Sequence, residues 1–240
     1  MFKISENKLL VISIILFFIF GYIVALSVVS FKQLEEKTPF VKEKIDSGEF
    51  AYAYNFYLNE NPSIASRPAY GNPNASVTML AFLDIDSETS KKFIMDIFPK
   101  LKQDFIDTGK IKYYHKNYIT SEDYKVKNNR YIYATTLSCI KMLKEDSYYD
   151  VYFELFKNSS NISSVVSKYN VSVDNFTYCL QNNEFDEIKE DMSEVENFGI
   201  PFGQKFYIGY TANYNTGLDG IPSYTTFRRI INEYQMRIGG

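Results

Sequence analysis

Residues 77–101 constrain the fold more than any other stretch, because they change from strand to helix within a few positions. Val77–Leu83 is a mostly apolar run of strand length. From residue 91 onward, apolar residues recur at the four-residue spacing typical of a helix, at Phe93, Ile97 and Leu101. Between strand and helix, residues 84–90 form a turn where helix N–H groups point outward and favour an anion. We therefore expect an α/β fold with any chemistry at this turn.

The remaining domain alternates between strand and helix signals. Residues 111–118 and 205–208 are expected to be strands, and residues 209–217 a polar turn. The predicted helices cover residues 87–108, 121–143, 148–156, 163–169, 173–181, 184–198 and 224–237. This order describes an α/β frame with an inserted helical block.

Composition excludes some classes of function. The chain has 240 residues, 45% of them hydrophobic and 17% aromatic, which is ample for one core. The net charge of −3 and the lack of a basic stripe argue against nucleic acid as a partner.

Residues 9–31 contain no charged side chain and exceed the ~20 apolar residues that cross a bilayer. We expect a transmembrane anchor here, after a short tail at residues 1–8. A cleaved signal peptide is the alternative, for which Ala25, Leu26 and Ser27 supply small residues. The run is longer than the roughly 7–15 apolar residues of a signal peptide. Lysines close to both ends of the run do not favour export of the following domain.

Residues 32–69 have the composition of a stalk and linker. Thr38 and Pro39 form a typical helix start, and a second short amphipathic piece covers residues 50–58. Residues 59–73 are rich in Pro, Asn and Ser and indicate a linker. The compact domain is thus expected at residues 70–240, with its helical insertion at about 120–198.

Several short motifs resemble those of the DsbA-like thiol:disulfide oxidoreductases, in the same order and at similar spacing. They are Gly71-Asn72-Pro73-Asn74-Ala75, Lys91-Lys92-Phe93, Pro99-Lys100-Leu101, Asp107-Thr108-Gly109-Lys110, Cys179-Leu180, Phe206-Tyr207-Ile208-Gly209 and Phe227-Arg228-Arg229-Ile230-Ile231. The resemblance implies a thioredoxin-like fold with an inserted helical subdomain, which agrees with the order of elements above.

The chain departs from the family at both redox positions. The family has Cys-x-x-Cys where this chain has Ser87, Glu88, Thr89 and Ser90. Serine replaces neither thiol, since its hydroxyl is not ionised near neutral pH and forms no exchangeable disulfide. The family also has a cis-proline before the third core strand, where this chain has Gln204. A competing register would use Pro222 instead, but it leaves too little chain for the closing strand and helix.

Cys139 and Cys179 are the only cysteines, and both lie in the predicted helical insertion. The resemblance implies a structural disulfide here, as some relatives carry one in the helical subdomain. In the chain-entropy model it would stabilise the fold by roughly 4 kcal/mol. Two buried free thiols and an active redox pair are the alternatives.

The sequence also contains N-glycosylation triplets, which would fit an exported domain. Their asparagines are Asn74, Asn158, Asn161, Asn170 and Asn175. Together with the implied disulfide, they favour an extracytoplasmic domain despite the lysine distribution.

Two other kinds of site are less well supported. A serine nucleophile needs a base, and His115, the only histidine, is interpreted as a strand residue without a partner. Asp84, Asp86 and Glu88 would suit a hard cation, but capping of the following helix explains them as well. We expect neither a metal nor a cofactor.

These observations predict a single-pass, membrane-anchored, DsbA-like protein whose domain lies outside the cytoplasm. With a degenerate active site, it would be a binding or scaffold module for a polypeptide or a membrane protein. One alternative is a thiol:disulfide oxidoreductase that uses Cys139 and Cys179. Another is an assembly subunit of a membrane complex, with contacts made by the anchor and by residues 40–58.

Overall fold

The structure is a computed structural model that describes residues 52–54, 60–64, 67–157, 161–200, 203–210 and 213–239. The predicted tail, the predicted anchor at residues 9–31 and most of the predicted stalk lie outside these residues. Of the helices that are described, none combines the length and apolar character needed to cross a membrane.

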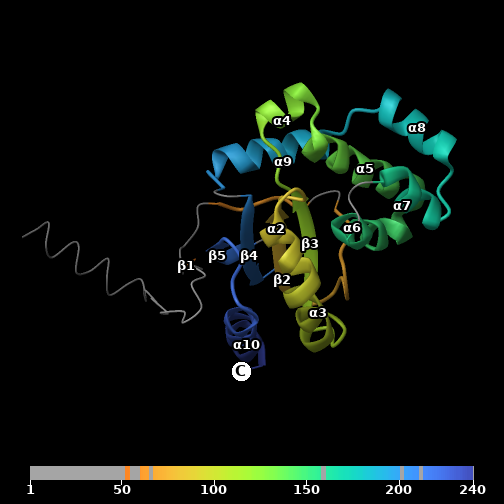
Figure 1. Cartoon of the computed structure of the whole chain (residues 1–240). Helices are drawn as coiled ribbons and strands as arrows, with labels where there is room; N and C mark the ends of the chain where they lie inside the picture. The colour runs from red at the N-terminus through yellow and green to blue at the C-terminus, as the bar shows by residue number, and fades with distance from the viewer. Residues whose placement is uncertain are drawn as a thin grey trace, which may run out of the picture. The chain divides into compact units, whose positions relative to one another are not determined.

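The core of the domain is a mixed sheet with the strand order β1-β5-β4-β2-β3 (Figure 1). The central strand β2 (Val77–Leu83) pairs in parallel with β3 (Ile111–Asn117) and antiparallel with β4 (Gln204–Tyr210). β5 (Asn213–Asp219) pairs antiparallel with β4 and with the short edge strand β1 (Tyr52–Tyr54). Every residue of β2 is buried, which confirms the apolar run as a central strand.

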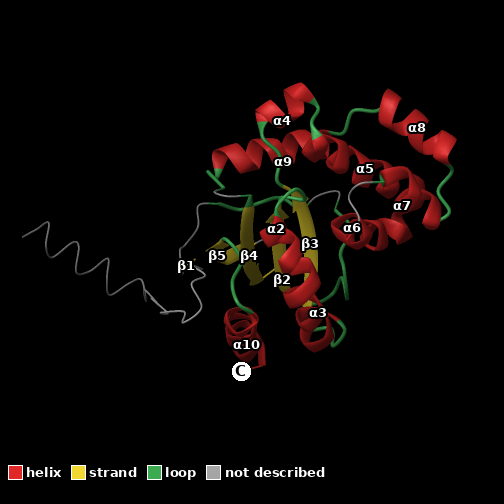
Figure 2. Cartoon of the chain, viewed as in Figure 1, coloured by secondary structure: helices red, strands yellow, loops and turns green. Residues whose placement is uncertain are grey.

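Helices, drawn in red in Figure 2, pack against this sheet of yellow strands. On one face lies a continuous helical segment made of α2 (Glu88–Lys92), the π-helical η1 (Phe93–Ile97), α3 (Phe98–Leu101) and the π-helical η2 (Lys102–Ile106). The C-terminal helix α10 (Tyr224–Gly239) packs beside it, and both contribute phenylalanines to one core cluster. The opposite face of the sheet packs against Val195 and Ile200.

The insertion between β3 and β4 is helical, as expected. Figure 1 shows α4–α8 in green to cyan, grouped to one side of the sheet. The elements are α4 (Ser121–Val126), α5 (Asn129–Lys144), the 3-10 turn η3 (Glu145–Ser147), α6 (Tyr148–Lys157), α7 (Ile162–Lys168), α8 (Val173–Asn182) and α9 (Asp186–Asn197).

The predicted helix 121–143 is divided into α4 and α5. Lys127 ends α4 in a left-handed conformation with φ 53°. The side chain of Asn128 then accepts a hydrogen bond from the Tyr131 N–H and caps α5. An asparagine in this position is a typical start signal for a helix.

The prediction of a turn at residues 209–217 was wrong, since most of these residues belong to β4 and β5. Tyr214, Thr216 and Leu218 are buried on β5, whereas Asn215 and Asp219 are half-buried. This period of two is the signal of a strand, although Asn and Gly give the segment the composition of a turn. The predicted amphipathic piece at residues 50–58 likewise contains β1.

Residues ahead of the predicted domain boundary near residue 70 contact the domain. Glu60 accepts hydrogen bonds of 2.7 Å from Lys205 Nζ and from the Tyr207 hydroxyl on β4. The Ser63 N–H donates to Glu194 of α9 at 2.8 Å. These contacts, with those of Arg67, fix the supposed linker to the domain, and we call Glu60, Ser63 and Arg67 the N-terminal clamp.

Arg67 forms the most buried contact of the N-terminal clamp. Its guanidinium lies 2.6 Å from Asp191 of α9, and both side chains are almost fully buried. Asp191 also accepts hydrogen bonds of 2.9 Å from the backbone and side chain of Asn117. The buried Lys116 of β3 donates to Ser63 O at 3.0 Å and to Glu194. A charged network therefore joins this segment, β3 and α9.

Candidate functional site

The turn at residues 84–90 lies where the ends of three strands meet. Leu83 ends β2 opposite Asn117 at the end of β3 and opposite Gln204 at the start of β4. The Asp84 N–H donates to Gly203 O at 2.9 Å, which holds the turn against β4. A Cβ on Gly203, whose φ is +77°, would lie 2.7 Å from the Cβ of Asp84. Only glycine permits this close approach.

A single amide group joins the two serines of the turn. Gln204 Nε2 donates to Ser87 Oγ at 2.7 Å and to Ser90 Oγ at 3.1 Å. Ser87 is also the N-cap of α2, and its Oγ lies 2.7 Å from the Thr89 hydroxyl. Ser90 and Gln204 are buried, whereas Ser87 is half-buried and Glu88 and Thr89 are exposed. The position expected for the cis-proline therefore faces both positions expected for cysteine.

This cluster contains no group that would activate a nucleophile. Among the described residues, neither serine hydroxyl contacts an imidazole or a carboxylate, so no base takes a proton from Ser87 or Ser90. Each hydroxyl is instead held by the neutral Gln204 amide. The arrangement supports hydrogen bonding, and it supplies neither a thiolate nor an alkoxide.

His115 does not belong to this cluster. It is buried in β3, where its Nε2 lies 3.2 Å from Asn117 Oδ1 and its ring packs 4.3 Å from the ring of Tyr152. Burial, the largest effect, lowers the pKa of His115 to about 3, so the ring is neutral near pH 7. The expectation that it has no partner was wrong, because it pairs with Asn117.

Asp84 is paired with an arginine that the sequence did not single out. Arg130, in the first turn of α5, donates to Asp84 at 2.8 and 2.9 Å and to Asp123 at 3.2 Å. These contacts raise the pKa of Arg130 above its usual value, with the hydrogen bond to Asp84 as the largest cause. The guanidinium forms hydrogen bonds to both oxygens of the Asp84 carboxylate. This ion pair joins the inserted subdomain to the turn. Arg130 and Asp84 are 46 residues apart, so no local sequence pattern predicts that they pair.

The two cysteines form a disulfide that links α5 to α8. The Cα atoms of Cys139 and Cys179 are 5.9 Å apart, and both residues are at most 1% exposed. The prediction of a disulfide is thus confirmed. The buried sulfurs lack the exposed, electropositive setting that reactive cysteines require, which argues against their use as a redox pair.

The glycosylation candidates differ in whether the structure describes them. Asn158 lies outside the described residues. The other four asparagines are exposed, at Asn74, Asn161, Asn170 and Asn175. Their exposure is compatible with glycosylation, which stays a prediction.

The comparisons with known proteins point in one direction. A family model described as thioredoxin matches residues 63–211. Disulfide bond formation protein D of Bacillus subtilis (strain 168) is 33% identical over 105 residues, covering 43% of this chain and 44% of that protein. The chain thus matches less than half the length of this relative.

Solved structures share the fold over most of the chain. BdbD from Bacillus subtilis, in the oxidised form, superposes with a TM-score of 0.62 at 20% identity, covering 78% of this chain and 100% of that one. The thiol-disulfide exchange protein α-DsbA2 from Wolbachia pipientis gives 0.58 at 20% identity, covering 71% and 88%. DsbA from Chlamydia trachomatis gives 0.56 at 15% identity, covering 72% and 94%. At these identities the likeness shows the fold.

Proposed function

Because the chain belongs to the thioredoxin family and has the fold of its DsbA-like members, we propose that it is a redox-inactive member that binds polypeptide. The proposal rests on one observation. Gln204 Nε2 bridges Ser87 and Ser90 at 2.7 and 3.1 Å, where disulfide exchange would need two thiols. The strands and helix that surround the site are those of the family fold. The side chains at the site form a hydrogen-bonded cluster of hydroxyl and amide groups in place of thiols.

Binding follows from what the scaffold retains. Related folds hold an extended polypeptide through strand-like contacts in a groove beside the active-site turn. Glu88 and Thr89 are exposed at this turn, so a partner reaches it without displacing core residues. The role proposed is therefore that of a binding or scaffold module.

We further propose that residues 9–31 anchor the protein in the membrane with the domain outside the cytoplasm. The uncharged length of residues 9–31 supports the anchor. The disulfide supports the location, because such bonds persist mainly in oxidising compartments. A membrane complex would be a natural setting for a module of this kind.

An exchange assay on the full-length chain in liposomes tests the redox proposal. Oxidation of a reduced dithiol peptide is measured for the native chain and for Cys139→Ala/Cys179→Ala. Both rates should equal the protein-free rate. Turnover that survives loss of both cysteines would contradict redox inactivity. Turnover that disappears with them would show that the chain is an oxidoreductase using these cysteines.

Photo-crosslinking tests the binding proposal. A photoreactive amino acid replaces the exposed Thr89 in one variant and the exposed Glu122 of α4 in a control variant. Unfolded polypeptide should be captured at position 89 at least several-fold more than at position 122. Equal capture at both positions would argue against a binding site at the turn.

A further inference from the structure

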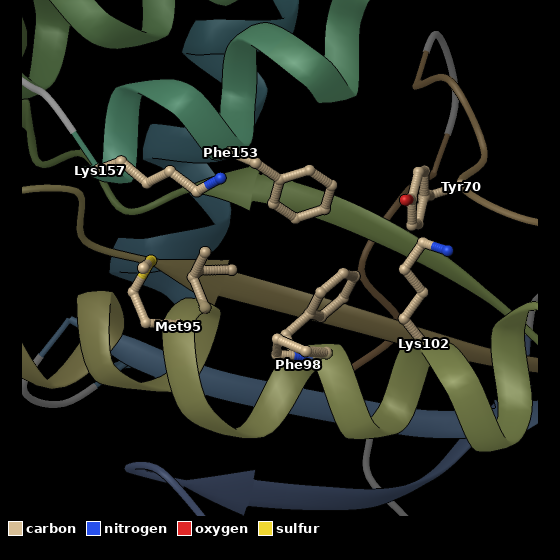
Figure 3. Close-up of a pocket in the computed structure, with 8 residues that line it drawn as sticks. Tyr70, Met95, Phe98, Lys102, Phe153 and Lys157 are labelled. Carbon is tan, nitrogen blue, oxygen red and sulfur yellow. The ribbon is translucent and has the colours of Figure 1, made fainter.

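A cavity of about 370 Å³ lies between the helical segment that follows the turn and α6 of the insertion. The rings of Phe98 and Phe153 are in contact, with centroids 5.0 Å apart, and line it together. Figure 3 shows Lys157 at one end and Lys102 beside Tyr70 at the other. Its volume is in the range of pockets that hold small molecules. The lining residues are Tyr70, Ile94, Met95, Phe98, Pro99, Lys102, Phe153 and Lys157.

The walls of this cavity suit an aliphatic chain better than a peptide. Both long walls are helices, whose backbone N–H and C=O groups are bonded within the helix. A peptide lying along these walls would gain no backbone hydrogen bonds from them. An aliphatic chain has no polar groups to satisfy, and the aromatic and aliphatic side chains of the walls pack against it directly.

The two lysines differ in charge balance. Lys102 Nζ donates to both carboxylate oxygens of Asp107 at 2.7 Å, so its charge is compensated. Within the described residues, Lys157 Nζ has neither an ion pair nor a hydrogen bond. The cavity therefore has one uncompensated cation at one end, which is complementary to a ligand with one anionic head group.

We propose that this cavity binds a free medium-chain fatty acid. The alkyl chain lies along the contacting rings of Phe98 and Phe153, and the carboxylate pairs with Lys157. A methylene group takes up close to the ~30 Å³ of a liquid water molecule, so about 370 Å³ holds a chain of roughly 12 carbons. This inference depends on the cavity alone and not on the proposed redox inactivity.

Photoaffinity labelling of the full-length chain in liposomes tests this site. The probe is dodecanoic acid with a terminal diazirine, and labelled peptides are mapped by mass spectrometry. Label should appear on η1, α3 and α6, and excess unlabelled dodecanoate should remove it. Competition should strengthen from 8 to 12 carbons, by up to about fourfold for each methylene group, and then level off.

Matched variants locate the chain and the head group. Met95 is 44% exposed, so Met95→Glu should fold and should reduce labelling at least tenfold by placing a carboxylate in the wall. Met142→Glu, at a residue 52% exposed on α5, is the control and should change nothing. Lys157→Met should weaken competition by dodecanoate about threefold to fivefold. It should leave competition by dodecanol unchanged, and Lys100→Met, outside the cavity, should affect neither.

Several results would overturn the proposal. Labelling confined to residues 9–31, or unchanged in Met95→Glu, would show that the cavity takes up no fatty acid. Labelling by a diazirine phospholipid but not by the free acid would assign the site to bilayer lipid. Displacement of the probe by a short acidic, aromatic peptide at the same concentration as dodecanoate would assign the site to polypeptide.

Discussion

Two pairs of residues invite comparison, one made of sulfur and one of oxygen. Cys139 and Cys179 are covalently joined and almost fully buried between α5 and α8. Ser87 and Ser90 are joined only through hydrogen bonds from Gln204, at a turn whose outer residues are exposed. Disulfide exchange requires accessible sulfur. In this chain the pair at the exposed turn has oxygen, and the pair with sulfur is fully buried.

The two pairs have different roles in the fold, because the disulfide contributes to stability and the serine pair lies at the position of the family's redox site. A buried cross-link restricts the unfolded chain and stabilises the native state without turning over. A hydrogen-bonded pair adds much less stability, because folding exchanges bonds to water for bonds within the protein. Removing the sulfur pair should therefore lower the free energy of unfolding far more than removing the oxygen pair.

The largest expected effect is loss of the disulfide. Cys139→Ala/Cys179→Ala should lower the free energy of unfolding by about 4 kcal/mol, since the bond closes a loop with a sequence separation of 40. Urea unfolding of the full-length chain, followed by circular dichroism, measures this change. Reduction of the native protein should give the same value, and a loss below about 1 kcal/mol would contradict a structural role.

Gln204→Ala should have the next largest effect, about 2 kcal/mol. The substitution removes a buried amide and leaves the buried Ser90 hydroxyl without its donor. The same unfolding experiment measures it, with the exposed Gln181→Ala as a control that should stay within about 0.5 kcal/mol. In a double-mutant cycle with Ser90→Ala, additive effects would show that the bridge contributes nothing.

We expect the stability of the domain to fall at mildly acidic pH. Neither pair explains this dependence, which we assign to His115. Burial lowers its folded-state pKa from 6.5 to about 3. Between these values the unfolded chain binds the proton more readily, so stability falls as pH falls, by about 2 kcal/mol from pH 7 to pH 5. Comparing the native chain with His115→Gln isolates this slope, because carboxylates contribute equally to both. Parallel curves would refute the assignment.

The smallest effect is expected for Ser87→Ala, about 1 kcal/mol. The substitution removes the N-cap of α2 and one acceptor of the Gln204 amide. Thermal unfolding measures it, with the exposed Thr177→Ala on α8 as the control. A loss approaching that of the disulfide variant would erase the contrast between the two pairs.

The central strand and the position of Gln204 were accessible from sequence because each depends on local pattern. Val77–Leu83 is a mostly apolar run, and the structure has β2 at the same residues. The family register placed Gln204 opposite the turn, where its amide meets both serines. A strand such as β5 is harder to recognise, because its buried residues alternate with Asn and Gly.

Contacts between distant segments left no such signal. Arg130 meets Asp84 across a separation of 46 residues, and Arg67 meets Asp191 across 124. Each arginine lies in a stretch whose local composition indicates only a helix or a linker. Charged residues are abundant on any surface, so their pairing emerges only when the chain is folded. The cavity beside Phe98 has the same origin, since its walls come from segments far apart in sequence.

The N-terminal clamp has a mechanical consequence. Tension applied to the chain ahead of Tyr52 meets first the pairing of β1 with β5, and then Glu60, Ser63 and Arg67 in series. The last two transfer the load to α9 through Glu194 and Asp191 before it reaches β2. A pull from the N-terminal side is thus shared among β5, β4 and α9 before it reaches β2 and the turn that holds Ser87.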